Sequence, residues 1–236
     1  MQLPPLVSAT LIKRYKRFLA DCRLASGEII TAHVANSGSM LGLTTPGAQV
    51  WLSRSDDPKR KLAYSWELVE AHGGWVNVNT SRPNAIVAEA LANGTIPGLA
   101  GYSNLRREVK YGTNSRIDIL LEDPARGRAY VEVKSVTMCR TPGLAEFPDA
   151  VTTRGAKHLT ELVGEVQSGH RAIMLYLVQI QSATRFTIAR DIDPDYGLEF
   201  DQARSAGVEV IICMCSVSPK EILIIGTLPL VDQIST

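Results

Sequence analysis

The sequence predicts two domains, an all-β barrel over residues 1–80 and a mixed α/β domain over residues 81–236. In the first 80 residues, short runs of β-branched and aromatic residues alternate with turns that contain Gly or Ser, which is typical of antiparallel strands. After residue 81, amphipathic helical patterns alternate with apolar strands. Strands separated by helices are typical of an α/β domain.

Five short strands are expected in the first domain, at residues 10–24, 28–36, 48–54, 62–71 and 75–79. Short strands joined by tight turns fit a small barrel of the OB-fold type. An OB-fold commonly binds single-stranded nucleic acids or oligosaccharides, so the barrel alone does not select a ligand.

The densest basic run of the chain, Lys13–Phe18, lies in this first domain and interleaves basic and aromatic residues. Such a run suits the phosphate backbone of a nucleic acid. We therefore predict four of its residues as nucleic-acid contacts: Lys13, Arg14, Lys16 and Arg17. The alternative is a solvated strand edge, where basic residues discourage aggregation.

In the second domain, Pro83 and Asn84 are expected to open a helix that ends at Gly94. The clearest helical pattern covers residues 154–168, and a further helix is expected at 196–206. Strands are expected at residues 105–111, 116–122, 128–136, 171–180, 185–190 and 208–215.

Two of these strands flank the turn Asp123–Gly127, and each carries an acid on its polar face. A hairpin centred on Ala125 places Asp118 opposite Glu132, with Cβ atoms about 5 Å apart. Lys134 projects on the same face as Glu132, because strand side chains alternate. Two facing carboxylates repel each other unless a proton or a cation lies between them, and Mg²⁺ takes oxygen ligands. The hairpin therefore predicts a metal site for phosphodiester cleavage.

The acid-x-Lys pattern is not diagnostic, since it also occurs at Asp57–Lys59 and Glu108–Lys110. Only Glu132–Lys134 has a second acid at the mirror position of a hairpin. The alternative interpretation is a solvated charge cluster on the sheet surface.

The Asp…Glu-x-Lys hairpin resembles the core of restriction-endonuclease-like nucleases with the PD-(D/E)xK signature. Longer segments resemble the bacterial sugar fermentation stimulation protein family, namely Val34–Met40, Arg106–Gly112, Ser115–Asp118, Glu132–Thr137 and Phe147–Leu159. The chain departs from the signature in lacking a Pro-Asp dipeptide before the hairpin. The resemblance implies an N-terminal OB-fold followed by a restriction-endonuclease-like mixed-sheet domain, with DNA binding and a regulatory link to sugar use.

Within this resemblance we predict metal ligands at Asp118 and Glu132, with Glu89 of the first helix as a further ligand, as an acid there serves in related nucleases. Mg²⁺ is the expected cofactor, with Mn²⁺ as a substitute. Lys134 would orient the attacking water or offset charge on the phosphate. Lys157, on the helix after the hairpin, is assigned to the same catalytic group. A solvated helix acid is the alternative for Glu89.

Four further residues are predicted as phosphate contacts: Arg107, Arg116, Arg154 and His158. The arginines could instead form surface salt bridges of small energetic effect, and His158 could belong to a solvated helix face. Asp149 precedes the 154–168 helix and could cap it or join the metal shell, with capping the favoured role.

Composition narrows the protein class. Hydrophobic residues make up 45% of the chain and charged residues 21%, which describes a soluble globular protein. No apolar run approaches the ~20 residues needed to span a bilayer, and the first residues do not resemble a secretory signal. The four cysteines show no CxxC pairing. We therefore expect a cytoplasmic protein that has no membrane partner.

The predicted function is that of a DNA-binding protein with a Mg²⁺-dependent nuclease-like site and a link to the regulation of sugar metabolism. RNA is a second candidate ligand, and the sequence leaves the oligomeric state open. The alternative is a non-catalytic DNA-binding transcriptional regulator that retains a nuclease scaffold. Sugar binding by the OB-fold is a third hypothesis.

Overall fold

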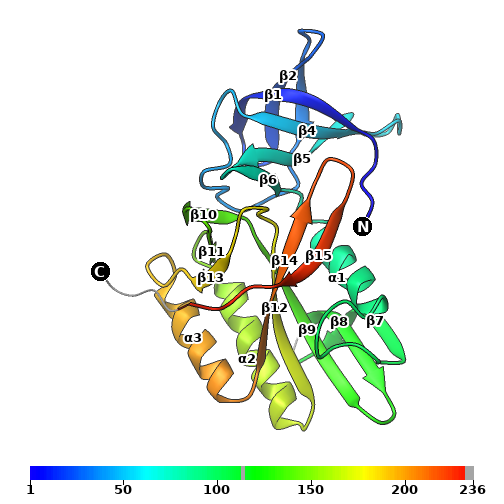
Figure 1. Ribbon diagram of the computed structural model, residues 1–236, viewed down its shortest axis with the longest axis vertical. Coiled ribbons are helices and arrows are strands. Elements are labelled where there is room, and N and C mark those ends of the chain that lie inside the picture. The colour runs from blue at the N-terminus through cyan, green and yellow to red at the C-terminus, as the bar shows by residue number, and fades with distance from the viewer. Residues whose placement is uncertain (113–114, 232–236) are drawn as a thin grey trace.

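The computed structural model describes residues 1–112 and 115–231, and it confirms a barrel domain followed by an α/β domain (Figure 1). The barrel is built from the strands β1 (Leu6–Tyr15), β2 (Leu19–Leu24), β3 (Ile29–His33), β4 (Gln49–Arg54), β5 (Tyr64–Ala71) and β6 (Gly74–Asn77). Their order is β3-β2-β1-β4-β5-β6, and pairing of β3 with β5 closes the barrel.

The expected strand at 10–24 is in fact two strands of a hairpin. The chain reverses at Lys16 and Arg17, whose φ angles are 47° and 62°. Neither residue type is a usual turn former, and positive φ is uncommon outside Gly, Asn and Asp. A reading of local residue types therefore cannot place this turn.

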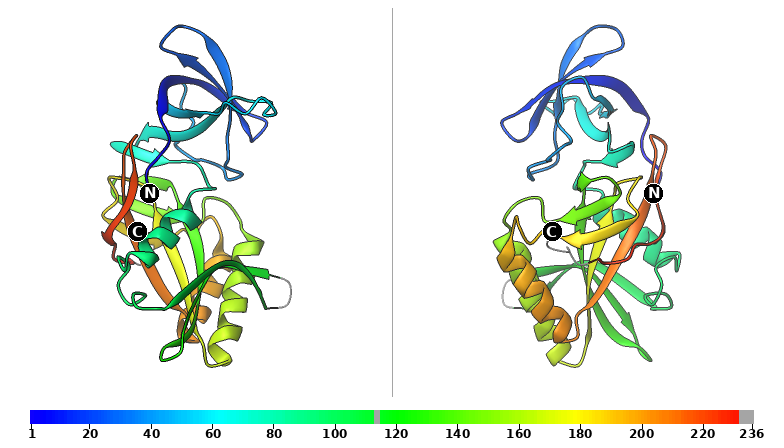
Figure 2. Two further views of the ribbon diagram at one scale, coloured as in Figure 1. Left: turned by 90° about the vertical axis from the view of Figure 1, so that its right-hand side faces the viewer. Right: turned by 60° about the vertical axis from the view of Figure 1, so that its left-hand side comes forward.

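The second domain contains the helices α1 (Pro83–Ala92), α2 (Thr153–Gln167) and α3 (Pro194–Ser205). Its main sheet contains β7 (Asn104–Tyr111), β8 (Ser115–Asp123), β9 (Gly127–Val136), β12 (Arg171–Val178), β14 (Glu209–Val217) and β15 (Ile222–Thr227). The order is β15-β14-β12-β9-β8-β7, with β9, β12 and β14 parallel. Helix α1 covers one face of the sheet, and α2 and α3 cover the other (Figure 2).

Two features of this domain were not expected from the sequence. A separate three-stranded sheet consists of β10 (Met138–Thr141), β11 (Leu144–Phe147) and β13 (Arg185–Ile188). The edge strand β15 also lies outside the expected elements. The strand expected at 185–190 is confirmed as β13, whereas no strand was expected at β10 or β11.

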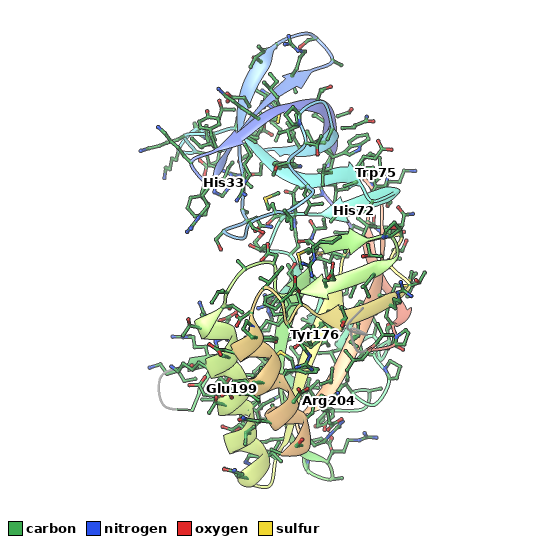
Figure 3. The ribbon with its side chains drawn as sticks, turned by 90° about the vertical axis from the view of Figure 1, so that its left-hand side faces the viewer. His33, His72, Trp75, Tyr176, Glu199 and Arg204 are labelled. Atoms are coloured by element: carbon green, nitrogen blue, oxygen red, sulfur yellow. The ribbon has the colours of Figure 1, made fainter. Side chains whose placement is uncertain are left out.

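Apolar side chains fill both faces of the main sheet, and the core beneath α2 and α3 is largely aromatic. Tyr176 of β12 is fully buried there, and its hydroxyl lies 2.6 Å from that of Tyr196 on α3 (Figure 3). The Phe147 ring packs against both tyrosines, with ring centroids 5.5 and 5.3 Å away. These contacts hold α3 against the strand next to β9, and α2 packs against both α3 and that strand, which positions the start of α2 beside the acidic hairpin.

The two domains are joined by a buried chain of polar side chains. Asn77 of β6 donates to Gln179 just after β12 (2.5 Å), and Gln179 donates to Ser135 of β9 (2.7 Å). Asn77 and Gln179 are both fully buried. Residues Met1 to Leu3, which we assigned to the first domain, run along β15 of the second, where the Leu3 amide donates to the Lys220 carbonyl (2.8 Å).

The helices in the described part of the chain are all too short or too polar to cross a membrane.

Candidate functional site

The β8–β9 hairpin has the expected register. Its pairs run from Ile119–Val131 to Asp123–Gly127, which is the register of a hairpin centred on Ala125. Counted outward from the turn, regular pairing ends at Ile119–Val131. At the next position the Val133 amide donates to the Asp118 carboxylate (2.8 Å) and not to the backbone of β8. The acid is thus held at the point where the two strands begin to separate.

Asp118 is anchored by a second donor that the sequence analysis did not assign. The Asn84 side-chain amide, in the first turn of α1, donates to Asp118 Oδ1 at 2.7 Å. Burial raises the pKa of Asp118, the charge of Glu132 raises it further, and the hydrogen bonds from Val133 and Asn84 oppose the change; the result is a pKa of about 6. The carboxyl therefore holds its proton more tightly than an exposed aspartate does.

Glu132 is buried, with 3% of its side chain exposed, and it lies on the sheet face that α2 covers. Its Oε1 accepts from Lys134 Nζ (2.9 Å) and contacts His158 Nδ1 of α2. Burial acts to raise the pKa of Glu132, but the His158 hydrogen bond and the Lys134 charge outweigh it, so the pKa is lowered. Glu132 Oε2 is buried and has no hydrogen-bond partner among residues 1–112 and 115–231.

His158 is buried rather than solvated, with 5% of the residue exposed. Arg154 Nε, which can only donate, lies 3.3 Å from His158 Nε2. His158 Nε2 therefore accepts, and Nδ1 is left to donate to Glu132. Lys134 Nζ also lies 3.0 Å from Nδ1. These contacts make His158 a positioning residue for Glu132, in place of the nucleic-acid contact or solvated position that we expected.

The structure does not bring Glu89 to the acidic pair. Its carboxylate pairs instead with the N-terminal amino group of Met1 at 2.9 Å, beside β15. Asn84 and Glu89 are five residues apart, which rotates them by about 140° around the helix axis. Since Asn84 faces Asp118, Glu89 points to another side of α1.

Lys157 and Glu161 of α2 form a loose ion pair, 3.5 Å apart, in which Lys157 is half-exposed and the carboxylate oxygens of Glu161 are buried. Both lie on the same helix face as His158. Neither carboxylate oxygen of Glu161 accepts a hydrogen bond from a residue in the described part of the chain. A buried acid without a hydrogen bond is rare and marks a place where a group is missing or a function resides.

The predicted basic contacts are distributed over both domains. Arg107 and Arg116 are exposed on β7 and β8, and Arg116 donates to the Glu108 carbonyl (3.1 Å). Lys16 and Arg17 are exposed in the β1–β2 turn. Lys13 is also exposed, 3.7 Å from Asp21.

Arg14 has a structural role instead. Its guanidinium donates to the backbone carbonyls of Arg17, Asn36, Gly38 and Ser39. These four bonds occupy most of its five donors, so little of the group remains for a phosphate.

Asp149 neither caps α2 nor joins the acidic pair. Thr152 is the helix cap, since its side chain accepts from the Gly155 amide at 3.1 Å. The Asp149 carboxylate instead accepts from Ser39 Oγ (3.1 Å) and the Met40 amide (3.3 Å) of the barrel domain. It thereby closes one side of an interdomain cavity of about 220 Å³.

Within residues 1–112 and 115–231, no three His, Cys, Asp or Glu side chains are arranged so that they could hold a metal ion. Asp118 and Glu132 have separate hydrogen-bond partners, yet the charge of Glu132 raises the pKa of Asp118. The arrangement offers two carboxylates and an ammonium group.

Comparison with known proteins assigns both domains. Residues 12–78 match the SfsA N-terminal OB domain, and residues 81–221 match the sugar fermentation stimulation protein RE domain. The chain belongs to the sugar fermentation stimulation protein family. The family's homologue from Azorhizobium caulinodans is 58% identical over 235 residues, covering 98% of this chain and 99% of the relative. The homologue from Rhodospirillum centenum is 60% identical over 231 residues, covering 98% and 99%.

A solved family structure has the same fold. Pyrococcus furiosus SfsA in complex with Ca²⁺ is similar with a TM-score of 0.87 and 25% sequence identity, covering 98% of each chain. The likeness extends through both domains, which bears out the fold expected for a member of this family.

Proposed function

We propose that this member of the sugar fermentation stimulation family binds DNA and hydrolyses its phosphodiester bonds at Asp118, Glu132 and Lys134, with Mg²⁺ as cofactor and Mn²⁺ as a substitute. The observation that carries the proposal is the Glu132 carboxylate. One oxygen is held by Lys134 and His158, and the other is buried with no hydrogen-bond partner. An orphaned anionic oxygen near a second acid fits a divalent cation.

The residues present fit Mg²⁺ in number and kind. Mg²⁺ commonly keeps several water ligands and takes one or two carboxylates, so Asp118 and Glu132 are sufficient. The archaeal relative was solved with Ca²⁺, another cation that takes oxygen ligands. When bound, the ion would supply charge stabilisation at the phosphate and a more acidic water.

Each neighbouring side chain has a task in this proposal. Asn84 and the Val133 amide hold the Asp118 carboxylate in place. His158 orients Glu132 so that its second oxygen is left available. The Lys134 ammonium would offset the charge that develops on the phosphate oxygens.

DNA would be bound by the basic side chains Lys13, Lys16 and Arg17 of the barrel together with Arg107 and Arg116 of the second domain. All five are exposed. Exposed Lys and Arg release counterions from a phosphate backbone on binding, which makes the affinity depend on salt. The link to sugar metabolism rests on the family name.

The test is a cleavage assay with single-stranded and duplex DNA in Mg²⁺, Mn²⁺ or EDTA. We expect cleavage by the wild type with either metal, and loss of cleavage in EDTA and in Asp118→Ala. Asp195→Asn, which removes an exposed acid of α3, is the matched control and should cleave normally. Cleavage that persists in Asp118→Ala would overturn the proposed site.

A non-catalytic DNA-binding regulator is the second candidate, and one observation favours it. The Lys134 ammonium is already hydrogen-bonded to Glu132 at 2.9 Å, as expected for a structural cluster. Binding of DNA that is independent of metal and unchanged in Asp118→Ala, without cleavage, would identify this alternative.

A further inference from the structure

Buried polar atoms without partners gather at one place in the second domain. Among the described residues, six such side-chain atoms occur, and four of them belong to Tyr111, Glu132 and Glu161. Folded proteins satisfy nearly all buried polar groups, so a local excess points to an ion or water that belongs between them. Two of these three residues are acids, which favours a cation.

The three residues come from different elements that meet beneath α2. Glu161 lies one turn after His158 on the same helix face, and His158 contacts Glu132 of β9. The Glu161 carboxylate lies against the end of β7, where a Cβ built on Gly112 would be 3.2 Å from its Oε1. Tyr111, the residue before Gly112, has only 8% of its surface exposed.

The charges of both carboxylates act on the Tyr111 hydroxyl. Burial raises the pKa of Tyr111, and the charges of Glu132 and Glu161 are the next largest causes, ahead of Asp118. The phenol therefore stays protonated, and its oxygen remains available as a neutral ligand. The half-exposed Lys157 at 3.5 Å is the one cation recorded beside Glu161 in the described chain, and it makes no hydrogen bond to that acid.

We propose that Glu132 Oε2, the Glu161 carboxylate and the Tyr111 hydroxyl form a site for a second hard divalent cation, which shares Glu132 Oε2 with the cation at Asp118. The site deepens the proposed nuclease centre, because it shares Glu132 with it. Its three oxygen ligands, completed by water, are of the kind that Mg²⁺ and Mn²⁺ take. Glu161 would thus supply the further acidic ligand that we had expected from Glu89.

The test counts Mn²⁺ ions bound by the full-length chain without nucleic acid, using the electron paramagnetic resonance signal of free Mn²⁺. We expect two ions per wild-type chain and one per Glu161→Gln chain. Asp195→Asn removes an exposed acid of α3 outside the site and should still bind two. Glu161→Gln that binds as many ions as the wild type, or a wild type that binds only one, would overturn the inference.

Two further measurements separate the site from a structural ion pair with Lys157. Without metal, Glu161→Gln should melt at a higher temperature than the wild type, because a buried unpaired charge is removed. A lower melting temperature would instead show that Lys157 stabilises Glu161, and the inference would fail. Tyr111→Phe keeps the ring that packs 5.9 Å from Tyr130 and should weaken the binding of one Mn²⁺ only.

The outcome for this site is independent of the outcome for catalysis. A wild type that binds two Mn²⁺ ions but cleaves no DNA would support the site while overturning the nuclease proposal. A wild type that cleaves DNA, with Glu161→Gln still binding two ions, would overturn the site alone.

Discussion

The buried imidazole of His158 on α2 hydrogen-bonds the Glu132 carboxylate on β9, and this contact ties the helix to the strand that carries the proposed catalytic acids. The bond uses Oε1 and leaves Oε2 without a partner. The same imidazole is held from its other side by Arg154. A helix residue therefore determines which oxygen of Glu132 remains available.

Replacing His158 should impair both the fold and the site. His158→Ala leaves Glu132 with Lys134 alone, and loss of a buried hydrogen bond to a charged group costs about 1–3 kcal/mol in the free energy of unfolding. Loss of a residue that orients a metal ligand typically lowers activity about 10–100-fold. Urea unfolding and the DNA cleavage rate would measure the two effects. Thr160→Ala, at an exposed position of the same helix, is the control, and equal behaviour of the two variants would contradict the assigned role.

The contribution of Asp118 to the stability of the folded protein should decrease as the pH rises from about 4 to 7. Asp118 has a pKa of about 6 in the folded protein against an ordinary value of 3.8, so the folded state binds the proton more tightly. Ionisation of Asp118 therefore lowers the free energy of unfolding, by about 2–3 kcal/mol at pH 7. The free energy of unfolding would be measured against pH for the wild type and Asp118→Asn. The difference between them should grow with pH, and a difference that stays constant from pH 4 to 7 would refute the assignment.

Two neighbouring arginines of the barrel should behave differently. Arg14 donates to four backbone carbonyls, so Arg14→Ala should lower the melting temperature. Arg17 is exposed in the β1–β2 turn, so Arg17→Ala should leave the melting temperature almost unchanged and weaken DNA binding. The slope of log affinity against log salt should become shallower by about one unit. Calorimetry and salt titrations of DNA binding would test this, and the opposite assignment of effects would show that Arg14 is the DNA contact.

Two glycines provide a test of the domain contact. A Cβ at Gly38 would lie 2.7 Å from Asp149 Oδ2, so Gly38→Ala must displace the carboxylate that joins the barrel to the loop before α2. A Cβ at Gly164 of α2 meets nothing within 4 Å, so Gly164→Ala should stabilise the helix by up to about 1 kcal/mol. Thermal melts should therefore shift in opposite directions. A neutral Gly38→Ala would mean that the domain contact is not tightly packed.

Much of this architecture follows from contacts that are close in the sequence. The Asp123–Gly127 turn and the alternating pattern of its strands specify the hairpin register, because a slip of one residue would turn every apolar side chain to the wrong face. Pro83 likewise marks the start of α1, and the apolar stripe at 154–168 marks α2. These elements could be predicted, as could the split into a barrel and an α/β domain.

The partners of the acids depend on how the helices dock against the sheet. Local spacing does not show which side of α1 faces β8, so Glu89 was as plausible as Asn84 until the packing placed Asn84 at Asp118. The burial of His158 and Glu161 has the same origin, since an i, i+3 spacing defines a helix face but not what covers it. The long-range contacts that decide these orientations are set by the whole core, and they become visible only in the folded chain.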